Sequence, residues 1–308
     1  MKRAIKCLRN KARILLICLI DFISNSKYCG FYSDSSTKRK WKILLLSHSI
    51  EKGMSIPNKR LNFGEEKALD LYKQLKNYNG IDEYAIKEGY SILSCYIDYR
   101  KRNGLSDLGI IIPPEIKKIQ AGSYKVKREE LLYDYKKFVE LCDVRHSVRE
   151  YADKFVEFND ILKAVDIAKK SPSACNRQMI KIYTTDDINA NRELSKIIPG
   201  NNGFKDQTAR YLFLVSDRNA FDFYEIDQWY LNGGIFVAYL QLALTSLNIG
   251  SCIYQWPKIK KLEKKAKKIL NIPKNEIIVS VISVGYYKET FEVLSSTRKK
   301  SEDFIVKI

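Results

Sequence analysis

Arg145-His146-Ser147-Val148-Arg149-Glu150-Tyr151 and, further along, Pro172-Ser173-Ala174-Cys175-Asn176-Arg177-Gln178 are the two stretches that decide how this chain is interpreted. In an extended segment, the alternating Arg145, Ser147 and Arg149 project to one side. Guanidinium groups bind phosphate oxygens through paired hydrogen bonds, and a serine hydroxyl can complete the shell. The first stretch therefore suits a phosphate, although the Arg-Ser-Arg pattern taken alone favours a surface salt-bridge cluster.

The second stretch has small residues followed by the carboxamides Asn176 and Gln178. A carboxamide offers both donors and acceptors, which suits the polar edge of an isoalloxazine ring. An ordinary polar helix start after a proline turn explains the same residues. The order and spacing of the two stretches, taken together, favour the cofactor interpretation.

The chain around these stretches predicts a mixture of helices and strands. Apolar residues recur at helical spacing over 159–170, which Ser171-Pro172-Ser173 ends, and over 233–247 and 262–270. Asn248-Ile249-Gly250 is a candidate helix C-cap. Strands are expected at 180–184, 210–215 and 276–285, the last with the continuous apolar run of a strand buried on both faces. There is no GxGxxG turn and no strict βαβ repetition, so a dinucleotide fold is not indicated.

Together these segments resemble the nitroreductase-like FMN proteins. Their opening signature is Arg-x-Ser-x-Arg-x-Tyr/Phe followed by Pro-Ser-x-x-Asn-x-Gln, and the later segments 248–252, 285–286 and 297–302 agree with it. The resemblance implies an α+β domain at residues 141–308, with a central, mostly antiparallel sheet flanked by helices. Residues 1–140 are then a basic, mainly helical N-terminal region.

The resemblance also implies a set of cofactor-binding residues. They are Arg145, His146, Ser147, Arg149 and Arg298 toward the FMN phosphate, ribityl chain and pyrimidine edge, Pro172, Ser173, Ala174, Asn176 and Gln178 from the partner subunit, and Gly250 and Ser251 near N5. Two departures from the family pattern stand out. His146 replaces a commoner Arg, and Met179-Ile180 replaces Pro-Trp, which puts ring stacking at that point in doubt.

By the same resemblance, the protein is a homodimeric oxidoreductase in which FMN takes electrons from NADH or NADPH and passes them to a small organic acceptor. The cofactor performs the chemistry, so no catalytic side chain or metal site is required. The main alternative is a non-catalytic flavin-binding or membrane-associated accessory module. Cys175 with His146 as a hydrolase pair is a further alternative.

The charge of the chain is concentrated near its beginning. The net charge is +18, and residues 1–60 hold 14 Lys and Arg against three acidic residues. No zinc-finger spacing, aromatic RNA-binding strand signature or basic-region heptad accompanies this excess, so nucleic-acid binding is not predicted. A solvated basic face or attraction to anionic lipid is preferred.

Lysines and arginines precede an apolar run at 14–20 that is too short to span a bilayer. This order is also that of a secretory signal peptide, with 24–26 as a weak cleavage site. We prefer a docked or interfacial helix that makes peripheral membrane contact. Seven scattered cysteines form no CxxC pair and their number is odd, which favours a reducing, cytoplasmic location.

The remaining N-terminal segments predict a loop at 30–38, helices at 65–79 and 83–102, a connector at 104–114 and a helix at about 128–141. Residues 48–53 (HSIEKG), with Arg60 and Phe63-Gly64, resemble an N-terminal extension of nitroreductase-like proteins linked to polysaccharide biosynthesis. A charged loop beside a helix is the preferred interpretation of these residues. The aromatic segment 216–232 is a candidate for the substrate-pocket wall or for the core.

Overall fold

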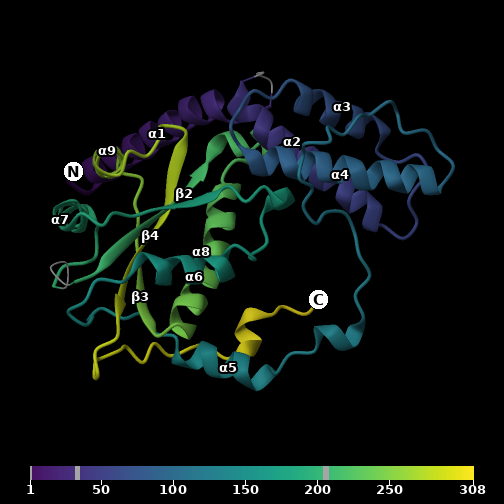
Figure 1. Ribbon diagram of the computed structural model, residues 1–308. Coiled ribbons are helices and arrows are strands. Elements are labelled where there is room, and N and C mark those ends of the chain that lie inside the picture. The colour runs from purple at the N-terminus through teal and green to yellow at the C-terminus, as the bar shows by residue number, and fades with distance from the viewer. Residues whose placement is uncertain (1, 32–34, 204–207) are drawn as a thin grey trace.

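The computed structural model describes residues 2–31, 35–203 and 208–308 (Figure 1). The first part of the chain is helical, with α1 (Lys2–Tyr28), α2 (Ser36–Ser55), α3 (Glu65–Lys76) and α4 (Glu83–Arg102). The segment after α4 has no regular element until the 3-10 turn η1 (Arg128–Leu131), and α5 (Tyr135–Val144) leads into the sheet domain. None of the helices in the described ranges has both the length and the apolarity of a membrane-spanning segment.

The sheet domain alternates helices with four strands. Its elements are α6 (Phe158–Ala168), η2 (Ala174–Asn176), β1 (Ile180–Tyr183), α7 (Ile188–Ile197), β2 (Arg210–Asp217), η3 (Arg218–Ala220), η4 (Phe223–Glu225), α8 (Gln228–Ser246), β3 (Ile249–Tyr254), α9 (Lys260–Ile269), β4 (Glu276–Tyr286) and η5 (Ser301–Phe304). The strand order is β1-β2-β4-β3, and each neighbouring pair is antiparallel. The predicted α+β domain with a mostly antiparallel sheet is therefore confirmed.

Side-chain alternation along β2 explains why both faces of the sheet are covered. Tyr211, Phe213 and Val215 pack in a cluster with residues of α7 and α9, whereas Leu212 and Leu214 pack with α6 and α8. All eight residues of β2 are buried. Because both faces of β2 are apolar, helices must cover the sheet on both sides of this strand.

The helical N-terminal region shares a core with the sheet domain. One cluster joins Trp41, Ile43 and Ile50 of α2 to Met179, Phe221 and Trp229 of the sheet domain. The indole N–H of Trp41 donates to Asp217 Oδ2 at 3.2 Å, and the backbone N–H of Gly30 donates to the Phe221 carbonyl. The division of the chain into two domains at residue 140 stays a prediction. Two such domains would share the apolar cluster described here.

Several predicted boundaries were wrong in detail. Residues 32–34 of the predicted 30–38 loop lie outside the described residues, and the loop does not extend to 38 because the side chain of Ser35 caps α2, which begins at Ser36. The single helix at 128–141 is a 3-10 turn followed by α5, which Asp134 caps. The 233–247 helix begins earlier, at Gln228. The 248–250 segment is not a cap as a whole: Asn248 takes the left-handed conformation with φ 57°, while Ile249 and Gly250 begin β3.

Candidate functional site

The first predicted stretch lies in an extended segment beside the edge of the sheet. Ser147 forms an isolated parallel bridge with Ser251, and the Val148 N–H donates to the Ser251 carbonyl at 3.0 Å. Val148 is fully buried, whereas its neighbours on both sides are half-exposed. Burial of this one apolar residue fixes the segment and leaves the polar side chains of its neighbours outside the core.

Two glycines make the close approach of this segment possible. Gly250 and Gly285 are paired across β3 and β4. A Cβ on Gly285 would lie 2.2 Å from the Tyr151 ring, and one on Gly250 would lie 3.1 Å from Val148. Tyr151 is held there by its hydroxyl, which lies 2.7 Å from Ser283 Oγ and donates to the Val148 carbonyl at 2.8 Å. These contacts show a packing role for both glycines.

The polar side chains of the segment gather around one cavity of about 270 Å³. Arg298, far away in the sequence, contributes to the same cavity. Its lining residues are Cys142, Asp143, Arg145, His146, Ser147, Arg149, Leu294, Ser295, Ser296 and Arg298. Three arginines against one carboxylate give the cavity an excess of positive charge.

Positive charge from this cavity acts on the groups around it. Burial raises the pKa of the Tyr287 hydroxyl, and Arg145 partly opposes that rise. Burial likewise raises the pKa of the Cys252 thiol, with Arg149 opposing it. Arg149 Nη1 donates to the Ser147 carbonyl at 3.3 Å, and Arg298 donates to the Ser296 carbonyl. The guanidinium groups keep further donors that are suited to an anion.

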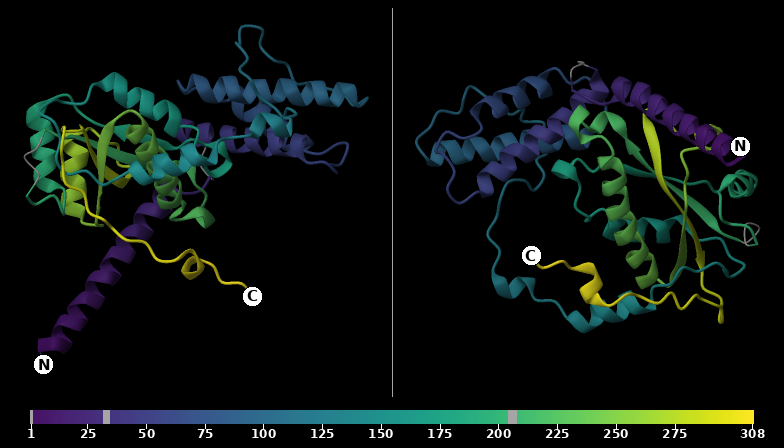
Figure 2. Two further views of the ribbon diagram at one scale, coloured as in Figure 1. Left: turned by 90° about the horizontal axis from the view of Figure 1, so that it is seen from below. Right: turned by 180° about the vertical axis from the view of Figure 1, so that it is seen from behind.

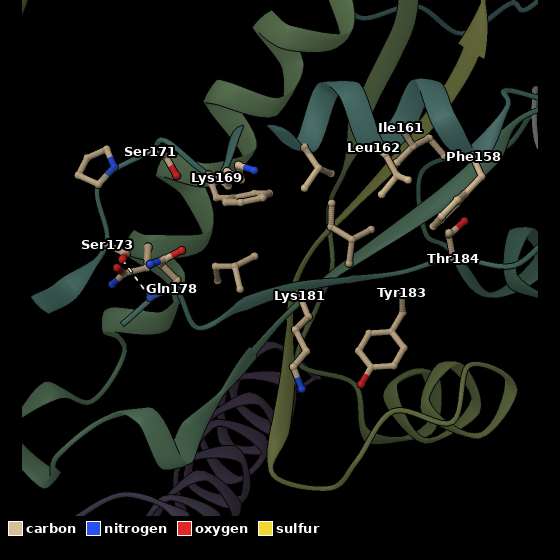
Figure 3. A pocket seen from close by; sticks show the side chains of 16 residues that line it. Phe158, Ile161, Leu162, Lys169, Ser171, Ser173, Gln178, Lys181, Tyr183 and Thr184 are labelled. Carbon is tan, nitrogen blue, oxygen red and sulfur yellow. Dashed lines mark hydrogen bonds between the residues drawn. The ribbon is translucent and has the colours of Figure 1, made fainter. Parts of the chain in front are cut away.

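The second predicted stretch lies against a different cavity, of about 430 Å³. Figure 3 shows Ser173 and Gln178 at one end of this cavity and Phe158, Leu162, Tyr183 and Thr184 toward the other. Pro172 lines it too, and α6, β1 and α8 form most of its apolar wall. The predicted residues thus form two groups within one chain. The structure brings Arg298 to the first stretch but places 172–178 at the second cavity.

The backbone of the second stretch is strained and tightly held. Cys175, Asn176 and Gln178 have φ of 50°, 48° and 51°. A non-glycine residue in this region costs on the order of 1 kcal/mol. The neighbouring Arg177 is buried, donates to both carboxylate oxygens of Glu225 at 2.5 and 2.9 Å, and holds the turn in place. As a result the side chains of Asn176 and Gln178 are exposed.

Contacts from other elements complete this site. Asn232 Oδ1 of α8 accepts from the Ala174 N–H at 2.7 Å, and Tyr84 Oη of α4 accepts from Gln178 Nε2 at 2.9 Å. Beside the first stretch, Gln241, also in α8, donates to Ser251 Oγ at 3.3 Å. The sequence pattern did not single out these three residues. The sequence could have indicated Asn232 and Gln241, because both are carboxamides at buried positions of an otherwise apolar helix. No feature of the sequence pointed to Tyr84.

The aromatic segment 216–232 is partly core and partly exposed. Phe221 and Trp229 are buried core residues with their rings 5.6 Å apart, whereas Phe223 and Tyr224 are exposed. None of these side chains lines the cavities at the two predicted stretches.

Comparison with known proteins agrees with the two stretches and the fold. Residues 143–232 and 225–286 match the model of the Nitroreductase family. Residues 143–286 of this chain belong to the nitroreductase family. The match begins just before the arginine cavity and ends at the last residue of β4.

Relatives of this nitroreductase domain occur in both archaea and bacteria. A protein of Archaeoglobus fulgidus, named "Putative NADH dehydrogenase/NAD(P)H nitroreductase", is 26% identical over 146 residues, which are 47% of this chain and 82% of that protein. "Putative NAD(P)H nitroreductase Spy0809" of Streptococcus pyogenes is 35% identical over 82 residues, which are 26% of this chain and 40% of that protein. A nitroreductase structure from Bacillus subtilis (ydfN) superposes with a TM-score of 0.50 at 16% identity and covers 57% of this chain and all of that chain.

Proposed function

We propose that the protein is an FMN-dependent oxidoreductase of the nitroreductase type that uses NADH or NADPH to reduce a small organic acceptor. The observation that supports this most directly is the cavity shared by Arg145, His146, Ser147, Arg149 and Arg298. These residues come from opposite ends of the domain and meet at the edge of β3. The names of the two curated relatives support the nicotinamide donor.

The donors present in this cavity fit a phosphorylated cofactor. Guanidinium groups bind phosphate oxygens in a bidentate manner, and a hydroxyl and an imidazole add single donors. His146 lies where the family more commonly has Arg, so an imidazole replaces one guanidinium group here. Gly250 and Ser251 lie directly behind the arginine segment through the bridge to Ser147. This bridge supports a role for the β3 backbone near the bound cofactor.

FMN, when bound, would accept a hydride and pass electrons onward. The role of this chain is to bind, orient and stabilise charge. Arg298 would add to the contacts with the phosphate, and Arg145 or Arg149 would stabilise the negative charge that accompanies reduction. Asn176 and Gln178 would orient the ring through carboxamide hydrogen bonds, and the strained turn held by Arg177 would keep them in place.

A second copy of the chain explains why the predicted residues form two groups. Within one chain, the arginines line one cavity, whereas Pro172, Ser173 and Gln178 of the turn line another. In a twofold dimer, each turn would complete the arginine cavity of the partner. Exposed apolar residues support an interface on this side: Phe158 and Leu162 line the same cavity as Ser173 and Gln178, and Leu231 lies in α8. Light scattering tests this: a strict monomer with full flavin occupancy would exclude a shared site.

An absorbance spectrum of the purified protein, followed by anaerobic titration with NADH and NADPH, tests the proposal. We expect a flavin spectrum that is bleached by at least one of the two donors. A protein that stays colourless after reconstitution with FMN would refute the cofactor assignment. Flavin that binds but is not bleached would favour a non-catalytic flavin-binding module.

We also propose a role in polysaccharide biosynthesis and a cytoplasmic location. A role in polysaccharide biosynthesis rests only on the resemblance of residues 48–64 to an N-terminal extension. The proposed cytoplasmic location rests on cysteine usage, because the sequence has seven scattered cysteines and no CxxC pair. Neither point affects the assignment of the flavin site.

A further inference from the structure

The helix α1 has two faces of different character. Its inner face packs on the sheet domain near its C-terminal end. There Ile17, Ile20 and Asp21 line a small cavity against Tyr230 and Trp256, and Lys258 Nζ lies 2.7 Å from Asp21 Oδ2. The remainder of α1 extends beyond the body of the molecule, as the left-hand view of Figure 2 shows.

The opposite face of α1 is apolar and uncovered. Seven large apolar side chains on it have exposed fractions between 53% and 71%: Ile5, Leu8, Leu15, Leu16, Leu19, Phe22 and Ile23. They recur at spacings of three, four and seven, so they form one stripe along the helix. Isolated exposed apolar residues are normal on a protein surface, but a continuous stripe of this length marks an interaction site.

The rest of the helix surface carries cations, and no acidic residue precedes Asp21 in the sequence. Lys6, Arg9, Lys11 and Arg13 are exposed, and residues 1–20 contain no Asp or Glu. The first acidic residue, Asp21, is already paired with Lys258. The adjoining α9 adds five exposed lysines, which are Lys260, Lys261, Lys264, Lys265 and Lys268. The surroundings of α1 are therefore strongly positive.

We propose that the apolar stripe of α1 inserts into the surface of an anionic lipid bilayer and holds the flavin domain at the membrane. The apolar stripe would lie at the level of the acyl chains, and the bordering lysines and arginines would reach the phosphate groups. A second copy of the chain fits this face less well. Packing two stripes together would bring two rows of cations side by side without acidic partners.

Co-sedimentation of the full chain with vesicles tests this proposal. Wild-type protein should bind vesicles of equal phosphatidylcholine and phosphatidylglycerol, and should bind pure phosphatidylcholine at least tenfold more weakly. The variant Leu15→Asp/Leu19→Asp should lose at least tenfold in partitioning to anionic vesicles. The variant Arg9→Gln/Lys11→Gln should bind more weakly and with a smaller salt dependence.

The matched control is Ile81→Asp/Leu132→Asp, which places the same charges at exposed apolar positions away from α1. It should bind vesicles as the wild type does. Circular dichroism checks that every variant is folded. Equal sedimentation of wild type and Leu15→Asp/Leu19→Asp would overturn the proposal. So would a halved molecular mass of that variant together with no vesicle binding by the wild type, because the stripe would then be a subunit interface.

Discussion

Arg298 reaches the arginine cavity from the exposed C-terminal segment, so its position there depends on the tertiary fold. We expect Arg298→Ala to weaken FMN binding by about 10- to 100-fold, as is typical for loss of a hydrogen bond to a charged group. Riboflavin, which lacks the phosphate, should bind the variant and the wild type equally well. Fluorescence titration measures both affinities.

Arg192→Ala is the control for this change, because Arg192 is exposed on α7 and lines neither cavity. It should leave both affinities unchanged. An equal loss of FMN and riboflavin affinity in Arg298→Ala would show that Arg298 does not contact the phosphate. Binding of neither ligand by the wild type would instead refute the flavin assignment itself.

Glu88 in α4 is a carboxyl group with 7% of its surface exposed. Burial raises its pKa to about 7, and the negative charge of Glu51 in α2 adds to the rise. The pKa of Glu51 is also raised, mainly by burial, with His48 opposing the rise. Tyr84, one turn before Glu88, is the residue that contacts Gln178, so this carboxyl pair lies behind the second predicted stretch.

A raised carboxyl pKa means that the folded state holds the proton more tightly than the unfolded chain. The free energy of unfolding should therefore fall as pH rises from about 4.5 toward 7, by at most roughly 3 kcal/mol. Glu88→Gln should flatten this dependence and be more stable than the wild type above pH 7. Urea denaturation at pH 5 and pH 8 measures it.

Glu66→Gln on the exposed face of α3 is the matched control and should keep the wild-type pH dependence. A Glu88→Gln variant whose stability falls with pH as steeply as that of the wild type would contradict the assignment to Glu88.

At the scale of elements, Gly285 of β4 and Gly234 of α8 should respond in opposite ways to replacement by alanine. A Cβ on Gly285 would lie 2.2 Å from the ring of Tyr151, which is buried and bonded to Ser283. We expect Gly285→Ala to destabilise the protein by more than about 2 kcal/mol, because the ring cannot move without exposing the segment that bears the arginines. Thermal unfolding followed by circular dichroism measures the change.

Gly234 in α8 has open space around the position of an added Cβ. Gly234→Ala should raise stability by roughly 0.5–1 kcal/mol, because alanine is the better helix former. If the two variants had the same stability, the contact between β4 and the 147–151 segment could not be as tight as described.

The sequence predicted helices and strands correctly where the apolar periodicity was strong. It failed where pairing with a distant segment sets the conformation. The apolar run at 276–285 predicted β4, and the helical spacing at 83–102 predicted α4. β3 was missed because its beginning, Ile249-Gly250, follows a helix end and resembles a cap. Strand pairing with β4 decided that conformation, and pairing is a contact between segments distant in sequence.

At the scale of the whole molecule, the helical N-terminal region and the sheet domain share buried residues. We therefore expect denaturation to show one transition, with circular dichroism and tryptophan fluorescence coinciding. Trp41 and Trp229 lie in the shared core, and Trp256 packs against Phe213 in the sheet. Phe221→Ala should shift the whole transition by about 3–5 kcal/mol.

Two separated transitions would contradict this expectation and would favour the division at residue 140. Loss of helix signal alone in Phe221→Ala would point the same way. An exposed control such as Phe223→Ala, two residues away, should change stability little.

The sequence by itself determined the similarity to the nitroreductase family and the α+β class, and it predicted the arginine and carboxamide residues of the candidate site, because motif spacing and apolar periodicity are local properties. Only the tertiary structure decided which of these residues meet. It joined Arg298 to Arg145 and Arg149, and it separated them from the 172–178 turn. It also placed Tyr84 against Gln178 and left the apolar stripe of α1 uncovered. These arrangements depend on packing between distant segments, which no single stretch of sequence specifies.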